Sequence, residues 1–133
     1  MEQLNFGFLD LSYDKEKDML ILDWSEDFVP EGKLKEDGTK IIEFAKKHKA
    51  SRILMDVSIA PQLHRSNQQY NDDVMIPAIT DEGIVKGAVV LPKKIFARLS
   101  LDTAYEEALS HLNHNTQAKQ FENRDEAIKW LMQ

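Results

Sequence analysis

The fold is decided by one short stretch, Arg52-Ile53-Leu54-Met55-Asp56-Val57-Ser58. This apolar run ends in an acidic and a hydroxyl residue, and a lysine-rich segment of helical character precedes it. The pattern is typical of a buried, parallel strand that follows a crossover helix and carries polar groups at its C-terminal end. Because ligands of open α/β sheets bind just beyond such strand ends, we expect any site near residues 56–67.

Strand and helix patterns alternate along the rest of the chain. The first two strands are separated only by a charged turn, which favours an antiparallel hairpin. We expect strands over residues 6–13, 19–24, 52–57, 84–91 and 118–121, and helices from 30 or 31 to 48, from 66 to a break or kink at 77, from 103 to 114 and from 123 or 124 onward. The order β-β-α-β-α-β-α-β-α predicts one α/β domain over residues 1–133, with helices packed on a mixed, mostly parallel sheet of about five strands.

Composition narrows the classes of partner and site. The chain has a formal net charge of −6, which disfavours nonspecific binding to nucleic acid and electrostatic attachment to anionic lipid. It has no cysteine, which excludes a disulfide scaffold, a thiolate zinc site and a cysteine nucleophile, and fits a reducing, cytoplasmic compartment. Neither a signal peptide nor a transmembrane segment is expected, because no apolar run is long enough.

Four features in order resemble the SpoIIAA-like branch of the STAS-domain family, a bacterial group also compared with the lipid-binding Sec14 fold. They are the opening hairpin (residues 6–24), the apolar strand ending Asp56-Val57-Ser58, the join from Met75-Ile76-Pro77 to residues 83–90, and the closing segment Phe121 to Leu131. The likeness spans nearly the whole chain. It implies a five-stranded mixed sheet covered by helices, a regulatory or binding role, and no established enzymatic activity.

The resemblance also implies a candidate for phosphorylation. Family members that antagonise anti-sigma factors carry an Asp-Ser-Ser-Gly run where the central strand meets its helix, and a serine there is phosphorylated. The corresponding stretch is His64-Arg65-Ser66-Asn67, in which only Ser66 matches and the Asp-Ser pair and the glycine are missing. From the residues alone, Ser66-Asn67-Gln68-Gln69 has the form of a capping box, so Ser66 is either an ordinary helix N-cap or a switch.

Three other patterns bear on catalysis, metal binding and phosphate binding. Asp56, Ser58, His64 and Ser66 include the residue types of a hydrolase triad, but no Gly-x-Ser-x-Gly elbow accompanies them, so we assign no catalytic residue. Glu107, His111 and His114 share a helix face, yet dipole-favoured histidines at a helix end explain them without a metal. No glycine-rich phosphate loop is present, and no cofactor is expected.

The first hypothesis is therefore a non-catalytic STAS-like module that binds a protein partner through Asp56, Ser58, His64, Arg65 and Ser66. The second is a carrier or sensor of a small apolar ligand or lipid, with a pocket around residues 59–63. Its lining would be apolar, from Val74, Phe96, Leu99 and Leu112. A third is an uncharacterised hydrolase. Homodimerisation and peripheral membrane contact both stay open.

Overall fold

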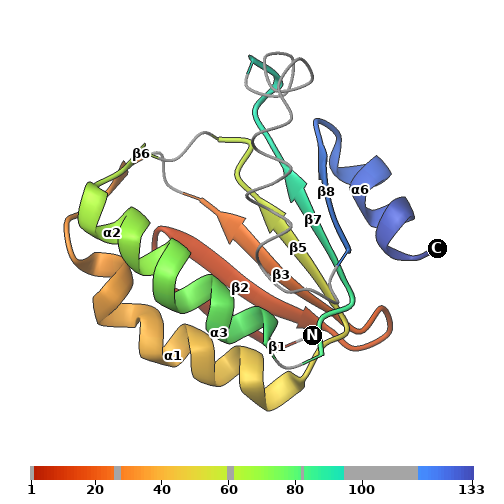
Figure 1. Ribbon diagram of the computed structural model, residues 1–133, viewed down its shortest axis with the longest axis horizontal. Coiled ribbons are helices and arrows are strands. Elements are labelled where there is room, and N and C mark those ends of the chain that lie inside the picture. Colours follow the sequence, from red (N-terminus) through yellow and green to blue (C-terminus); the bar gives the residue numbers. More distant parts are fainter. Residues whose placement is uncertain (1, 26–27, 60–61, 82, 95–116) are drawn as a thin grey trace.

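A computed structural model describes residues 2–25, 28–59, 62–81, 83–94 and 117–133 (Figure 1). Its main sheet has six strands in the order β1-β2-β3-β5-β7-β8, so the α/β class and the mixed, mostly parallel sheet are confirmed, with one strand more than expected. The strands are β1 (Glu2–Asn5), β2 (Leu9–Asp14), β3 (Met19–Trp24), β5 (Arg52–Asp56), β7 (Lys86–Val90) and β8 (Gln117–Phe121). A separate parallel pair joins β4 (Phe28–Val29) to β6 (Gln62–Leu63).

The N-terminal half of the sheet is antiparallel. The expected hairpin forms between β2 and β3, but the predicted strand over residues 6–13 is wrong at its start, because the chain turns at Gly7. Gly7 has a φ of 87°, a conformation that side chains with a Cβ rarely adopt, and its N–H donates to Asn5 Oδ1 at 2.8 Å. This turn folds β1 back onto β2 as an additional, unpredicted strand.

Strands β3, β5, β7 and β8 run parallel, and each pairs with the next in chain order. Helix α1 (Lys33–His48) connects β3 to β5, and a helical segment of α2 (Arg65–Tyr70), η1 (Asn71–Met75) and α3 (Ile76–Thr80) connects β5 to β7. Figure 1 shows both connections in front of the same face of the sheet, as expected when successive crossovers have the same hand. The last helix, α6 (Arg124–Leu131), packs against β5, β7 and β8.

Side chains that alternate along the strands divide the core into two clusters. Leu22 and Met55 point to the larger cluster, where the apolar stripe of α1 packs on the sheet. Met19 and Leu54 point to the opposite face, where Leu131 of α6 covers them. Helix α6 therefore lies across the sheet from α1.

Two helices differ from the predicted ones in their extent. The helix expected to break or kink at Pro77 does not break there but continues to Thr80, because its middle widens into a π-helix in which Ile76 N–H donates to Asn71 O. Proline has no N–H to donate, and its ring clashes with the carbonyl four residues earlier in an α-helix; a wider turn relieves that clash. Helix α1 also begins at Lys33 rather than at Pro30 or Glu31.

Candidate functional site

Two carboxylates stand side by side at the C-terminal ends of the parallel strands. Asp23 ends the apolar run of β3, Asp56 ends that of β5, and the two are register partners in neighbouring strands. Partners in register point to the same face of a sheet, here the face that carries α6. Two adjacent like charges repel each other, so this arrangement requires a cation nearby.

Arg124, the first residue of α6, supplies that cation. Its Nη1 donates to Asp56 Oδ2 at 3.0 Å and also to Asp23 Oδ1, and its Nη2 donates to Asp23 Oδ2 at 3.3 Å. The planar guanidinium suits this two-carboxylate bridge because its N–H groups diverge in one plane. The hydrogen bonds that Arg124 donates to Asp23 and Asp56 raise the pKa of its guanidinium against the opposing effect of burial.

The second oxygen of Asp56 is also engaged. Its Oδ1 accepts hydrogen bonds from the backbone N–H of Ser58 at 2.9 Å and from Ser58 Oγ at 2.6 Å. Burial opposes ionisation of Asp56, but the hydrogen bonds from Ser58 and Arg124 outweigh it and hold the pKa of the carboxyl below its usual range. Both oxygens of Asp56 are therefore occupied by internal donors.

The C-terminal end of α6 is also attached to the sheet by cationic side chains. Arg52, at the start of β5, donates from Nε to Leu131 O at 2.7 Å, and Lys86, at the start of β7, donates from Nζ to Trp130 O at 3.0 Å. Cations are favourable at the C-terminal carbonyls of a helix. Lys86 Nζ also lies 4.9 Å from the centre of the Trp130 ring. Helix α6 is thus fixed to the sheet at both ends, and the Asp23–Arg124–Asp56 bridge makes the attachment at its N-terminal end.

A second polar group lies where α2 begins. His64 is the N-cap of α2, and its Nδ1 accepts the backbone N–H of Ser66 at 3.2 Å. Ser66 Oγ lies 3.1 Å from the same nitrogen. The prediction that Ser66 is the N-cap of a capping box is therefore wrong. The helix begins one residue earlier, at Arg65, and an imidazole nitrogen takes the place of the expected hydroxyl.

Asn67 fixes the position of this group. The side chain of Asn67 is fully buried, and its Nδ2 donates to Pro30 O at 2.8 Å and to Val29 O at 3.3 Å. Its Oδ1 accepts the N–H of Leu34 in the first turn of α1 at 3.3 Å. Asn67 therefore supplies the cap that Gly32, the N-cap residue of α1, cannot provide.

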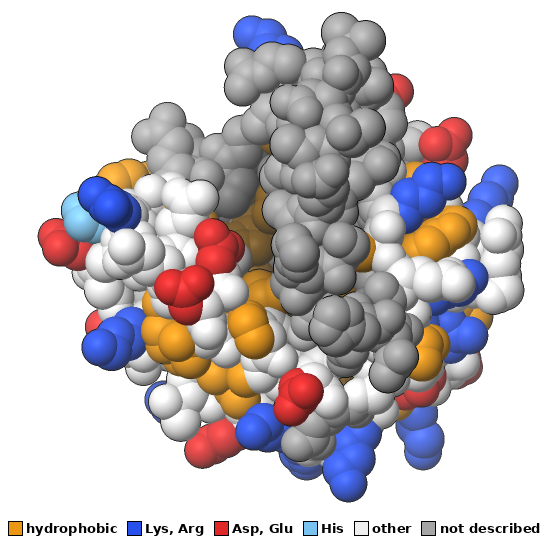
Figure 2. All heavy atoms as spheres, in the orientation of Figure 1, with side chains coloured by type: hydrophobic (Ala, Val, Ile, Leu, Met, Phe, Trp, Pro, Cys, Tyr) orange, Lys and Arg blue, Asp and Glu red, His pale blue; other side chains and the backbone are white. Residues whose placement is uncertain are grey.

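Exposed apolar side chains flank the two polar groups. Phe28 lies on the connection that leaves β3, with 64% of its surface exposed, and Ile59 lies on the connection that leaves β5, with 43% exposed. Backbone pairing of β4 with β6 holds Phe28 beside the segment that precedes His64. Figure 2 shows a histidine at this corner of the molecule with hydrophobic, basic and acidic surface around it.

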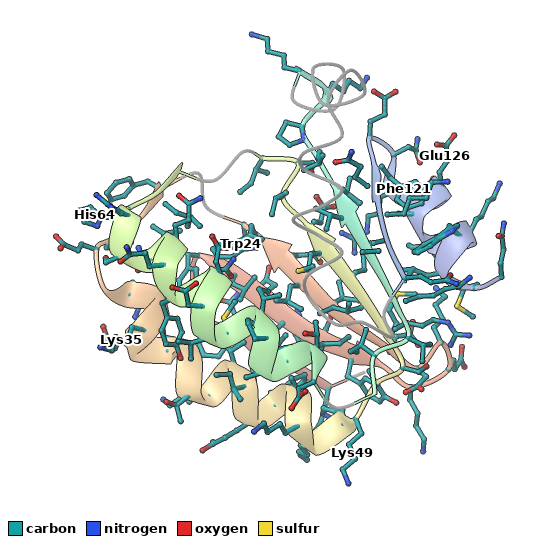
Figure 3. The ribbon with its side chains drawn as sticks, in the orientation of Figure 1. Trp24, Lys35, Lys49, His64, Phe121 and Glu126 are labelled. Carbon is teal, nitrogen blue, oxygen red and sulfur yellow. The ribbon has the colours of Figure 1, made fainter. Side chains whose placement is uncertain are left out.

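The expected site over residues 56–67 thus divides into two groups. Asp56 is bonded to Ser58 and Arg124, whereas His64 contacts Ser66, so the residue types of a hydrolase triad are not joined into one. Figure 3 shows His64 on the opposite side of the molecule from Glu126, which belongs to the same helix turn as Arg124. Arg65 is exposed beside His64.

Asp23 and Arg124 were missed by reasoning from the sequence, although signals for both exist. Asp23 follows an apolar strand in the same way as Asp56 does. Arg124 is a cation in the first turn of a helix, where the macrodipole disfavours positive charge, so it needs an acidic partner from elsewhere in the fold. Read together, these two signals indicate the bridge.

Of the residues named for the lining of the predicted apolar pocket, Val74 lies in the described part of the chain. Val74 is 46% exposed, so it does not line an interior cavity, and Phe96, Leu99 and Leu112 lie outside the described residues. Glu107, His111 and His114 also lie outside them. Within the described ranges, no group of three acidic or histidine side chains is placed to hold a metal ion.

Comparison with known proteins found no matching family model, no matching curated protein and no matching solved structure. Among the helices that the structure describes, none is both long and apolar enough to cross a membrane.

Proposed function

We propose that the chain is a non-catalytic binding or regulatory module of the STAS-like type, which acts through contacts with a protein partner. The partner surface is the corner formed by Phe28, Ile59, Ser58, His64 and Arg65. The observation that carries the proposal is the exposure of Phe28, the most exposed of the large apolar side chains in the described part of the chain. A cysteine-free chain suits a cytoplasmic setting for this role.

The composition of this corner supports a protein partner. Exposed aromatic side chains commonly supply the anchor of a protein interface, and a rim of polar groups surrounds that anchor. Here the polar side chains are those of His64 and Arg65, which are exposed directly after β6, the strand that pairs with β4 at Phe28, and Ser58 is exposed beside Ile59. The backbone pairing of β4 with β6 and the buried Asn67 hold the corner in place, which lowers the conformational entropy lost on binding.

The state of the acidic residues argues against catalysis at the strand ends. A general base must have an oxygen free to accept the proton of a substrate. Both oxygens of Asp56 accept internal hydrogen bonds, and its lowered pKa makes it a weak base at neutral pH. A binding role therefore agrees better with the described geometry, and with the resemblance to the STAS family, than a hydrolase does.

A pair of matched variants tests the partner surface. Phe28→Ser removes the proposed anchor, and Val85→Ser removes an apolar side chain of similar exposure, 53%, that precedes the N-terminal end of β7. Capture experiments with lysate of the source organism should lose partners with Phe28→Ser and keep them with Val85→Ser. Equal partner sets for wild type and Phe28→Ser, at matched folding, would place the surface elsewhere.

The proposed switch and the ligand alternative have their own tests. Ser66 lies in the first turn of α2 and contacts His64, so a phosphate there would add negative charge beside the partner surface. Ser66→Asp should change partner capture, whereas Ser66→Ala should not.

Stabilisation of the delipidated protein by fatty acids or phospholipids would instead support the apolar-ligand carrier, because a ligand specific to the native state raises the melting temperature.

A further inference from the structure

The edge strand β1 has backbone groups available for pairing. Within the described chain, the backbone of β1 pairs with β2 alone, in a register that places Leu4 opposite Leu11. Phe6 N–H donates to Leu9 O at 2.9 Å, and bonded residues alternate along an antiparallel strand. The backbone groups of Leu4 therefore face β2, whereas those of Gln3 and Asn5 face outward from the sheet.

A groove runs between this strand and α1. It has a volume of about 330 Å³, and its lining combines apolar and charged side chains from both elements: Glu2, Gln3, Leu4, Lys40, Glu43, Phe44 and Lys47. Leu4 is 39% exposed and faces the α1 side of the sheet with Leu11. The groove therefore places an apolar surface directly beside the exposed edge of β1.

The charges that normally protect an edge strand are neutralised here. Natural edge strands often carry a charged side chain that prevents pairing with another chain. Glu2 is the charged residue of β1, and its carboxylate contacts Lys47 Nζ at 2.9 Å and also the imidazole of His48. Two lysines and two glutamates line the groove, so it carries no formal net charge, although the whole chain carries −6.

We propose that β1 pairs antiparallel with β1 of a second copy of this chain, about a twofold axis through Leu4. In this register Gln3 of each copy lies opposite Asn5 of the other, and their outward backbone groups make four hydrogen bonds. Leu4 then meets its own counterpart as the central pair without backbone hydrogen bonds, where side chains approach most closely. A neutral groove on an acidic protein favours a second copy, because two such edges meet without charge repulsion.

The central position of Leu4 gives a specific test by sedimentation velocity from about 1 to 500 μM. Wild-type protein should form a dimer of modest affinity, because a short strand and a groove bury less area than a standard interface. Leu4→Lys and Leu4→Glu should each weaken dimerisation about ten-fold or more, since like charges meet at the axis. An equimolar mixture of the two variants should recover the dimer. A monomeric wild type, or a mixture that stays monomeric, would overturn the proposal.

A backbone variant separates this interface from others. Gln3→Pro removes an outward N–H that β2 does not use, so it should abolish dimerisation and leave the hairpin of β1 and β2 intact. Gln3→Ala, which keeps the N–H, is the matched control and should dimerise like wild type. Thermal unfolding of both variants checks that each is folded. A dimer that survives Gln3→Pro would place the interface on another surface and refute the pairing of β1.

Discussion

Replacing Arg124 with methionine tests whether the bridge between β3 and β5 holds α6 on the sheet. Arg124→Met keeps a long, flexible side chain but leaves Asp23 and Asp56 facing each other without a cation. Two effects then destabilise the native state at neutral pH: the charged hydrogen bonds are lost, and the two carboxylates repel each other. A smaller effect acts the other way, because a cation is removed from a helix N-terminus.

The exposed fractions of the Arg124, Asp23 and Asp56 side chains determine how much stability Arg124→Met should cost. Exposed ion pairs contribute about 0–1 kcal/mol, and breaking a buried pair by removing one partner costs about 3–5 kcal/mol. The side chains of Arg124 and Asp23 are 39% and 35% exposed, whereas that of Asp56 is 14% exposed. The bridge lies between the two limits, so we expect Arg124→Met to lower the free energy of unfolding by about 1–2 kcal/mol at pH 7.

The pH dependence has a definite sign. The folded state lowers the pKa of Asp56, so this carboxylate stabilises the protein above the pKa of the unfolded chain, about 3.9. That contribution disappears as the pH falls through the still lower pKa of the folded state. The difference between wild type and Arg124→Met should therefore be largest near pH 7 and shrink below pH 4.

Urea unfolding followed by circular dichroism measures this difference, because urea, unlike guanidinium, does not screen charges. Lys129→Met is the matched control, since Lys129 is an exposed cation on the same helix. The reasoning fails if Arg124→Met destabilises the protein no more than Lys129→Met does at pH 7. It also fails if the loss at pH 3 equals the loss at pH 7, because the bridge would then not depend on ionised carboxylates.

Three further substitutions test the packing. Gly38→Ala should lower the free energy of unfolding by about 1–3 kcal/mol, because a Cβ there would overlap the Tyr70 ring. In a Tyr70→Leu background the same change should be neutral or stabilising, and urea unfolding of both pairs of variants measures the difference. Trp130→Ala should cost about 2–3 kcal/mol, less than for a fully buried tryptophan, and a loss under 1 kcal/mol would make α6 peripheral. His64→Ala should cost about 0.5–1 kcal/mol through loss of the cap, whereas Ser66→Ala should change the melting temperature little; the reverse ranking would restore Ser66 as the cap.

The alternation of strand and helix patterns in the sequence was sufficient to predict the central, parallel part of the sheet. The apolar runs that became β3, β5 and β7 are strand-sized and bounded by turn or helix signals, so their type could be read locally. Gly87 of β7 lies close to its neighbouring strand, and a Cβ there would lie 3.1 Å from Ile53 Cγ2. These predictions succeeded because burial on both faces leaves a strong composition signal.

Features that depend on distant partners could not be read in the same way. Strand β1 is exposed along its length, so Glu2-Gln3-Leu4-Asn5 shows no apolar alternation, and its strand conformation comes from pairing with β2. The cap of α2 was assigned to Ser66 because hydroxyls are the commoner caps, whereas the imidazole of His64 occupies that role. Arg124 is separated from Asp23 by about three quarters of the chain, so only the fold brings them together.

The two proposed surfaces are compatible in one assembly. The partner surface lies beyond the C-terminal ends of β3 and β5, and β5 is three strands away from β1, roughly 14 Å at the usual strand spacing. A twofold axis normal to the sheet at Leu4 reverses the strand direction in the second copy, so the two partner surfaces would point in opposite directions along the strands of a continuous sheet. Such a dimer binds two partners at once and gains avidity only for partners that are themselves linked. A complex of two chains with two partners, reduced to one of each by Gln3→Pro, is the stoichiometry that both proposals together require.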